Sequence, residues 1–327
     1  MENVKTKNKF RQFGKLVLWV LLVQIILINI SASLYGYKLT HFYKSNGLNK
    51  SVSSRNIFTK TWKLFTGPKY VKYPITEIPQ FAFETVKLNT RDHIPIEAWY
   101  SRVDSAKGTV ILFHGISANK SNMLSEAYEF RWLGYNVMLV DLRAHGNSGG
   151  NYTTAGFKES EEVKLAYDYA SQIGNKNIFL YGVSMGAVII MKAISDYNIQ
   201  PAGIILEMPF ASLHDHLKAR ARTLGFPEEP FGFLVTFWVG LERGFNGFKH
   251  NTCLYAEKVN CPVLMQWGAL DNYVQRGEIE RVYQHIPSQK KKLVVYEHAS
   301  HESMLNNEPK KWRKEVSDFL QLQVIIF

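Results

Sequence analysis

The chain has 327 residues and a formal net charge of +11, with 46% hydrophobic and 20% charged residues. This composition is ordinary for a globular protein and excludes a mainly disordered chain. Lys and Arg are scattered, and their densest clusters flank an N-terminal apolar segment, so we expect attraction to anionic lipid and no nucleic-acid partner. Cys253 and Cys261 have neither CxxC spacing nor a His/Cys cluster, which predicts neither a zinc site nor a disulfide framework.

A long apolar segment near the N-terminus predicts a membrane anchor. Residues 16–30 carry no charge, and five basic residues precede them: Lys5, Lys7, Lys9, Arg11 and Lys15. Crossing a bilayer takes about 20 residues, a length that the run reaches when Gln24, Asn29 and the small residues after it are counted. Because basic residues accumulate on the cytoplasmic side, we expect a transmembrane segment over 1–35, with its N-terminus in the cytoplasm and the remaining chain on the outer side. The alternative is a signal peptide cleaved near Ser33, which would release a soluble exported protein.

Beyond this segment, the sequence predicts a linker followed by one large α/β domain. Residues 36–80 are mixed, aromatic and basic and indicate a juxtamembrane linker, whereas 81–327 alternate short apolar runs with stretches of helical period. Such alternation is typical of a mostly parallel sheet with helices on both faces. Eight strands are expected, at 81–88, 96–103, 109–113, 136–140, 177–181, 203–206, 262–267 and 292–296. The clearest expected helices are 121–133, 158–172, 185–195, 276–285 and 309–320.

The alternation is interrupted between about 210 and 250. This stretch is long for a connection, and it combines Pro227 and Pro230 with several aromatic residues. We therefore expect a small helical cap inserted over the edge of the sheet.

A serine flanked by glycines follows one of the expected strands. The motif Gly-Val-Ser-Met-Gly at 182–186 directly follows strand 177–181 and opens an apolar helix. A strand that turns sharply into a helix strains the central residue, and side chains at the flanking positions would collide with the neighbouring strand and helix. Ser184 would then lie at the carboxyl edge of the sheet, above a helix N-terminus that favours negative charge. The motif predicts Ser184 as a nucleophile, with Gly182 and Gly186 permitting the turn.

A serine nucleophile needs a general base and a carboxylate that orients the base. Asp271 follows strand 262–267, and His301 lies in the loop after strand 292–296. The chain order Ser, Asp, His is that of hydrolases with a nucleophile elbow and differs from the orders in chymotrypsin and subtilisin. His298, three residues earlier, is the rival base; the family resemblance given below, which places the base immediately before the Glu of the closing loop, implies His301.

The oxyanion of a tetrahedral intermediate needs two backbone donors. The first expected donor is the N–H of Met185, the residue after the nucleophile. The second is the N–H of Ile116, in the loop where His114 and Gly115 end strand 109–113. Gly115 is expected to allow a close approach of the backbone.

Taken together, these motifs resemble the α/β-hydrolase superfamily, in particular membrane-associated bacterial hydrolases of the serine aminopeptidase-like and monoacylglycerol lipase-like groups. The resemblance extends over most of the chain after residue 80 and rests on residues 112–115 with 119–120, 141–148, 182–186, 268–271 and 298–302. Ala144 stands where the Asp-Arg-Gly-His-Gly motif of the family has glycine. The resemblance implies the α/β-hydrolase fold and hydrolysis of an ester, thioester or amide, without choosing among them.

The sequence thus predicts a serine hydrolase that cleaves a carboxylic ester of a lipid or small acyl compound through an acyl-enzyme, without a cofactor or metal. The apolar cap favours lipid or medium-chain acyl substrates. Peptidase, amidase, thioesterase and acyltransferase activities are the alternatives, and a non-catalytic membrane scaffold is opposed by the complete Ser, Asp, His set. His214 and His216 flank Asp215 as metal ligands would, but no third ligand has suitable spacing, so we expect no metal there.

Overall fold

An eight-stranded sheet forms the centre of the computed structural model, which describes residues 2–44, 57–67 and 69–324. The strand order is β10-β9-β8-β7-β5-β6-β4-β3. The pairs β3–β4 and β4–β6 are antiparallel, and the remaining pairs are parallel. The strands are β3 (Glu84–Asn89), β4 (Pro95–Ser101), β5 (Thr109–Phe113), β6 (Asn136–Val140), β7 (Ile178–Val183), β8 (Gly203–Glu207), β9 (Val263–Gly268) and β10 (Lys291–Tyr296). The predicted eight-stranded, mostly parallel sheet is confirmed, with strand ends shifted by at most three residues.

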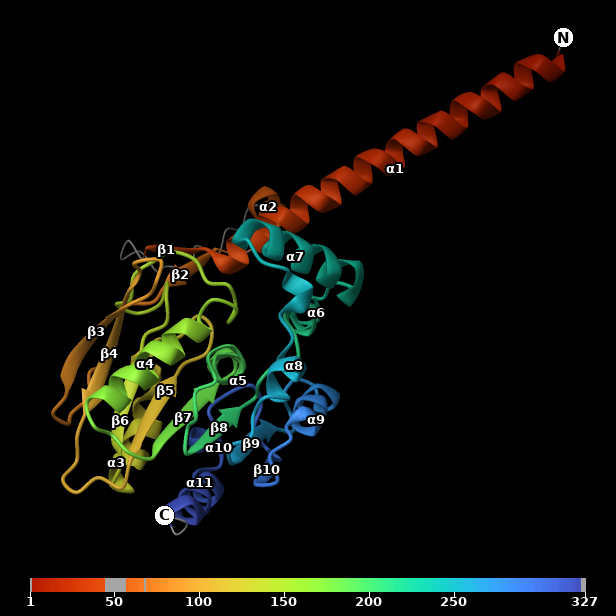
Figure 1. Ribbon diagram of the computed structural model, residues 1–327. Coiled ribbons are helices and arrows are strands. Elements are labelled where there is room, and N and C mark those ends of the chain that lie inside the picture. The colour runs from red at the N-terminus through yellow and green to blue at the C-terminus, as the bar shows by residue number, and fades with distance from the viewer. Residues whose placement is uncertain (1, 45–56, 68, 325–327) are drawn as a thin grey trace.

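Helices cover both faces of this sheet, as expected (Figure 1). Consecutive contacts join α4, α5, α8 and α9 into one layer and α3, α10 and α11 into the other. The central strands β5, β6 and β8 are buried at every residue, which explains their continuous apolar sequences. The helices are α3 (Leu124–Trp132), α4 (Ser160–Gln172), α5 (Met185–Tyr197), α8 (Thr252–Ala256), α9 (Arg276–His285), α10 (Met304–Asn307) and α11 (Pro309–Val324).

The insertion between β8 and α8 contains two helices, α6 (Leu213–Thr223) and α7 (Glu228–Arg243), which contact each other extensively. Pro227 stands immediately before the first residue of α7, where a missing N–H has no cost. The two helices form the expected small cap at the end of the molecule from which the N-terminal helix projects (Figure 1).

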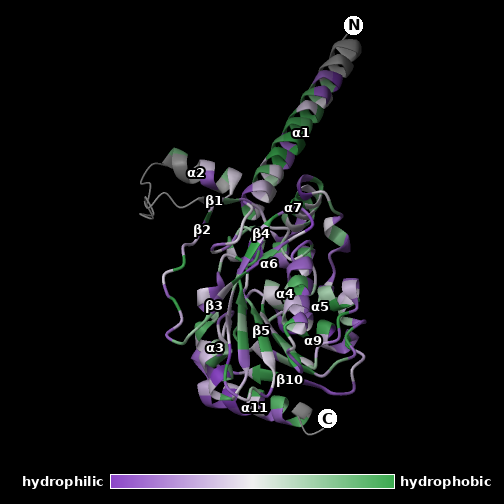
Figure 2. Cartoon of the chain, turned by 60° about the vertical axis from the view of Figure 1, so that its left-hand side comes forward, coloured by the Kyte–Doolittle hydropathy of each residue, from purple (hydrophilic) through white to green (hydrophobic). Residues whose placement is uncertain are grey.

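The N-terminal helix α1 (Glu2–Thr40) has two parts, one exposed and one packed against the cap. Residues Phe10–Thr40 are long and apolar enough to cross a membrane, and an 18-residue stretch of them has a mean hydropathy of 2.3. The apolar side chains between Phe10 and Ile30 are exposed, and this part projects away from the sheet (Figure 2). Its length, apolar surface and isolation are those of a membrane-spanning helix.

The last turns of α1 pack against the cap and form a second apolar core. Ala32, Tyr35 and Leu39 are buried there with residues of α6 and α7. The spacing of these three residues places them on one side of a helix. The helix therefore continues to Thr40, where its end is held by these protein contacts.

Two polar contacts hold this helix end on α7. Ser33 Oγ donates a hydrogen bond to Glu242 Oε1 at 2.7 Å, and Arg243 Nε donates to Thr40 Oγ1 at 2.7 Å. Beyond α1, β1 (Phe42–Lys44) pairs in parallel with β2 (Tyr70–Lys72), and α2 (Ile57–Thr66) lies between them in the chain. The described parts of the predicted linker thus contain regular structure.

Candidate active site

Ser184 lies in a strained turn between β7 and α5. Its φ of 54° falls in the left-handed region, which is costly for a residue with a side chain. The Ser184 N–H donates to the carbonyl of Glu207 on the adjacent strand at 2.7 Å, which holds the turn against the sheet. A Cβ on Gly182 would lie 2.4 Å from the Gly186 carbonyl carbon, and one on Gly186 would lie 2.1 Å from the Phe113 oxygen. Both glycines are therefore required by close packing.

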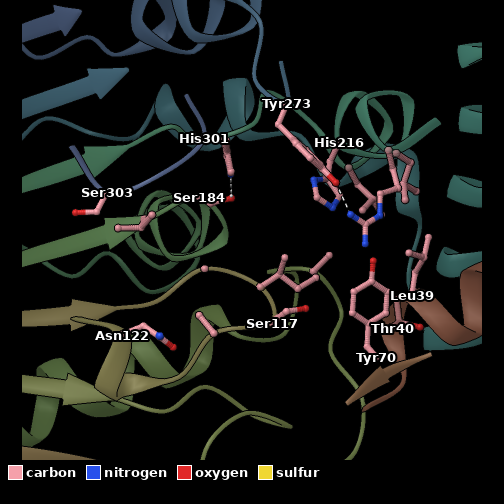
Figure 3. A pocket seen from close by; sticks show the side chains of 18 of the residues that line it. Leu39, Thr40, Tyr70, Ser117, Asn122, Ser184, His216, Tyr273, His301 and Ser303 are labelled. Carbon is pink, nitrogen blue, oxygen red and sulfur yellow. Dashed lines mark hydrogen bonds between the residues drawn. The ribbon is translucent and has the colours of Figure 1, made fainter. Parts of the chain in front are cut away.

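The structure brings the three predicted residues into one hydrogen-bonded chain (Figure 3). His301 Nε2 lies 3.1 Å from Ser184 Oγ, and His301 Nδ1 lies 2.7 Å from Asp271 Oδ2. Because the Asp271 carboxylate accepts only, Nδ1 carries the proton and Nε2 is left as the acceptor that faces the serine hydroxyl. The rival His298 is exposed in the same loop.

Asp271 is held so that one oxygen faces the histidine. Its Oδ1 accepts hydrogen bonds from the N–H groups of Tyr273 and Val274, at 2.7 and 2.9 Å. The Asp271 side chain is fully buried, whereas the His301 side chain is 27% exposed toward the pocket. Two amide donors thus stabilise the buried carboxylate in its charged form and fix the direction of the bond to His301.

The two predicted oxyanion donors flank the serine from different elements. Met185 opens α5, and Ile116 lies in the loop after β5 and lines the same pocket as Ser184. Neither amide donates to an acceptor within the described parts of the chain. A Cβ on Gly115 would lie 3.4 Å from Ser184 Cβ, which is ordinary contact, so this glycine is less constrained than the two glycines of the serine turn.

His114 braces the loop that carries Ile116. Its Nε2 accepts a hydrogen bond from the Leu142 N–H at 3.1 Å, so its Nδ1 carries a proton and donates to the Gly115 carbonyl at 2.7 Å. The ring is completely buried, and burial lowers the pKa of His114 to about 4. A neutral imidazole in a fixed tautomer is suited to holding a loop.

His145, in the loop after β6, is held by the same two kinds of hydrogen bond. Its Nε2 accepts from the Ser117 N–H at 3.2 Å, and its Nδ1 lies 2.7 Å from the Arg143 carbonyl. Burial lowers the pKa of His145 to about 3, so this ring is neutral as well. The two imidazoles connect the loops after β5 and β6.

A buried ion pair fixes the same two loops. Lys120 Nζ lies 2.5 Å from Asp141 Oδ2 and 2.9 Å from Glu97 Oε1, and the Lys120 N–H donates to the other Asp141 oxygen at 2.7 Å. The side chains of Lys120 and Asp141 are both fully buried. The Asn147 N–H also donates to Asp141. These contacts give a structural role to the Asn-Lys and Asp-Leu-Arg-Ala-His-Gly motifs.

A cavity of about 360 Å³ opens beside the catalytic residues. In Figure 3, Asn122 and Ser303 lie on one side of Ser184, and Leu39, Thr40 and Tyr70 lie on the other. The cap adds further lining residues from α6 and α7: Leu213, His216, Leu217, Arg220 and Val239. The pocket is thus bounded jointly by the sheet edge, the cap and the N-terminal region.

The contribution of the N-terminal region was missed by the sequence analysis. Leu39 and Tyr70 both belong to the segment interpreted as the linker 36–80, and no local pattern marks them as pocket residues. The spacing of Ala32, Tyr35 and Leu39 could have predicted part of this contribution, because it places three apolar residues on the side of a helix that packs against protein.

The remaining candidates for metal or redox chemistry lie apart from one another. His214 Nε2 is 2.7 Å from Glu229, whereas His216 lines the pocket. Within the described residues, no group of His, Cys, Asp and Glu side chains could hold a metal ion. Cys253 and Cys261 are both free.

A model of the serine aminopeptidase S33 family matches residues 104–229 and 250–310. The chain belongs to this family. It is an enzyme of the α/β-hydrolase class, as the motifs predicted. The matched ranges contain Ser184, Asp271 and His301, and the stretch between them coincides with most of α7.

Known relatives and solved structures agree with this assignment. An uncharacterized protein of Bacillus subtilis, YqkD, is 28% identical over 229 residues, which are 69% of this chain and 75% of the relative. The lysophosphatidylserine lipase ABHD12 of Danio rerio is 27% identical over 51% of this chain, and the match spans 44% of that protein. The structure of the Pyrococcus furiosus esterase Pf2001 shares the fold, with a TM-score of 0.64 at 24% identity, covering 77% of this chain and 98% of that one.

We predict that Gly186→Ala destabilises the protein by about 3 kcal/mol or more, because the added methyl group would overlap the Phe113 carbonyl. Urea unfolding of the detergent-solubilised protein measures the change. Gly277→Ala is the matched control, since no atom lies within 4 Å of its added Cβ and the site is on an exposed helix. This control should alter the unfolding free energy by less than about 1 kcal/mol. Equal effects of the two substitutions would contradict the steric argument.

The pKa of His114 predicts a pH-dependent contribution to stability. The folded pKa of about 4 lies below that of an unfolded histidine, so the unfolded chain takes up the proton first as the pH falls below about 6.5. The stabilisation by His114 is therefore present above pH 6.5 and is lost toward pH 4. We expect the difference in unfolding free energy between wild type and His114→Gln to shrink by about 2 kcal/mol between pH 7.5 and 5. A difference independent of pH would exclude a neutral buried His114.

Proposed function

We propose that this protein hydrolyses carboxylic esters of lipids or small acyl compounds, with Ser184 as nucleophile, His301 as general base and Asp271 as the residue that orients the base. The hydrogen-bonded chain from Asp271 through His301 to Ser184 carries this proposal. Each of the three residues follows the carboxyl end of a parallel strand, where α/β enzymes place their chemistry.

The geometry supports a two-step acyl transfer. His301 Nε2 takes the proton of Ser184 Oγ as this oxygen attacks the ester carbonyl, and the imidazolium that forms is stabilised by Asp271. The amides of Ile116 and Met185 stabilise the oxyanion. His301 then donates the proton to the departing alcohol, leaving an acyl-enzyme. A water molecule, deprotonated by His301, releases the acid and restores Ser184.

The lining of the pocket favours an ester over an aminoacyl amide. An aminopeptidase has to bind a free ammonium group, for which a carboxylate is the usual partner. Glu126 lines the pocket, but it is buried, accepts a hydrogen bond from Ser303 Oγ at 2.6 Å, and burial raises its pKa. The charged form of the Glu126 carboxyl group is therefore disfavoured. Much of the remaining lining is apolar, which suits an acyl chain, and the relative from Danio rerio is a lipase by name.

Labelling with a fluorophosphonate probe, combined with an assay of turnover, tests the proposed triad. We expect the wild-type protein to label and Ser184→Ala to lose labelling, because the probe reacts with an activated serine. Asp271→Asn should reduce the turnover of p-nitrophenyl esters by about four orders of magnitude, because an amide at this position favours the wrong imidazole tautomer. His298→Gln is the matched control and should retain the wild-type rate, since its side chain is exposed.

Two outcomes would contradict this proposal. Failure of the wild-type protein to label, while a known serine hydrolase labels in the same sample, would exclude an activated Ser184. A higher kcat/KM for aminoacyl p-nitroanilides than for p-nitrophenyl esters would replace ester hydrolysis by peptidase activity.

We propose further that α1 is retained as an anchor, with a cytoplasmic N-terminus, an anchoring segment 1–35, a linker 36–80 and a catalytic domain 81–327 on the outer side. Cleavage near Ser33 would remove Ala32 from the second apolar core and interrupt the helix where it packs on α7. This packing supports retention, and the cluster of basic residues before the apolar run supports the orientation.

The anchor predicts that the mature protein keeps its full mass and stays with the membrane after high-salt and carbonate washing. Mass spectrometry of the purified protein and protease treatment of intact spheroplasts check both points. Protease should digest the catalytic domain from outside while leaving the N-terminal segment protected. A mature chain that begins near residue 34 would exclude the anchor.

A further inference from the structure

One end of the catalytic pocket contains a cation between two tyrosine rings. Arg220, on the cap helix α6, lines the pocket together with Tyr70 of β2 and Tyr273 of the loop after β9. The Arg220 guanidinium carbon lies 5.1 Å from the centre of the Tyr70 ring and 5.9 Å from that of Tyr273. Arg220 also donates a hydrogen bond to the Tyr273 hydroxyl. These contacts hold the guanidinium at a defined place in the pocket.

Arg220 differs from the neighbouring cations in having no acidic partner. Lys218 and Arg222, on the same helix, both pair with Glu228, at 3.6 and 2.8 Å. Among the described residues, the ion pairs of this region involve Lys218, Arg222 and Arg281, and none involves Arg220. Arg220 is partly buried, and a partly buried charge is costly when it is unpaired. The site is therefore electrostatically suited to an anion.

The hydroxyl groups beside Arg220 can donate to the same anion. The Tyr70 hydroxyl is buried and has no hydrogen-bond partner among the described residues. The Tyr273 hydroxyl accepts from Arg220, which leaves its own proton available. In Figure 3, Tyr70 and Tyr273 both lie on the side of Ser184 that is away from Asn122 and Ser303.

Among the described residues that line the pocket, none forms an ion pair with Arg220. His216 also lines the pocket, and burial lowers its pKa to about 4, so its ring is neutral. Glu126 is hydrogen-bonded to Ser303, which Figure 3 places on the opposite side of Ser184. The Tyr273 ring stacks obliquely on the His301 ring, with 5.4 Å between their centres, which puts the cationic end next to the catalytic histidine.

We propose that Arg220, Tyr70 and Tyr273 form a subsite for an anionic group, a carboxylate or phosphate, carried by the ester substrate. The ester carbonyl lies at Ser184 while the anion binds the guanidinium, and Leu39, Leu217 and Val239 contact the carbon chain. This subsite rests on the proposed esterase function. It narrows the substrate class to acyl esters that bear a negative charge, and it makes β2 and the end of α1 part of the specificity pocket.

Matched substrates that differ in charge and in one methyl group test the subsite on the full-length protein in detergent. One series consists of p-nitrophenyl half-esters of dicarboxylic acids from glutaric to sebacic acid, and the neutral series consists of their methyl esters. We expect the wild-type kcat/KM ratio of anionic to neutral substrate to exceed about ten at the best chain length. Arg220→Gln should lower this ratio at least tenfold, and Tyr70→Phe should lower it about threefold.

Arg222→Gln is the matched control. Arg222 lies two residues away on the same helix, carries the same charge and does not line the pocket, so its substitution should leave the ratio unchanged. Arg220→Lys keeps the charge but loses the planar fork, and an intermediate ratio is expected. Fluorophosphonate labelling of every variant confirms that Ser184 is still active, and Arg220→Lys replaces Arg220→Gln in the comparison if the latter does not label.

A second pair of substrates separates lipid from soluble sources of the anion. Lysophosphatidic acid and monoacylglycerol of equal chain length, presented in mixed micelles, differ only in the phosphate. A preference for the lysophospholipid alone assigns the subsite to lipid headgroups, and a preference for half-esters alone assigns it to soluble acids. Equal turnover of charged and neutral partners in both pairs, or an unchanged ratio in the Arg220 variants, would overturn the subsite while labelling still supports the triad. Absence of wild-type labelling would instead reject the hydrolase proposal itself.

Discussion

Ser184 keeps a left-handed backbone conformation because the chain has no room to relax on either side of it. Gly182 and Gly186 pack against main-chain atoms at distances that exclude any side chain, and the Ser184 N–H is bound to the carbonyl of Glu207. The strain is held by the central parallel strands, which are buried on both faces. The serine hydroxyl consequently projects from the carboxyl edge of the sheet. His301 and the loop that carries Ile116 lie beside it there.

The loops around this turn are positioned by buried polar groups that stay in one protonation state. His114 and His145 are neutral because burial lowers the pKa of each, and each ring donates to one carbonyl and accepts from one amide. The Lys120 and Asp141 pair binds the same loops through charge. A buried network of this kind is stable only when nearly every donor and acceptor is satisfied. It therefore favours one conformation of these loops.

The N-terminal helix α1 extends from exposed apolar turns to the pocket beside Ser184. Its exposed apolar turns have the character of a transmembrane segment, whereas Leu39 reaches the wall of the catalytic pocket. The same helix is held on the cap by Ala32, Tyr35 and polar contacts. The cap and the end of α1 are thus packed together, and both line the pocket beside Ser184.

Sequence alone determined the sheet, the turn at Ser184 and the predicted partners Asp271 and His301, because these depend on local period and on the order of motifs along the chain. The apolar runs located eight strands, and the positions of Ser184, Asp271 and His301 after the ends of three parallel strands predicted that they meet at one edge. Only the tertiary structure decided that Leu39, Tyr70, Arg220 and Tyr273 share a pocket. These residues come from segments with unrelated local patterns, and their proximity follows from the packing of α1 and the cap. Hydropathy likewise located the apolar part of α1 but not its last turns. The side of a helix that faces protein depends on which residues of other elements pack against it.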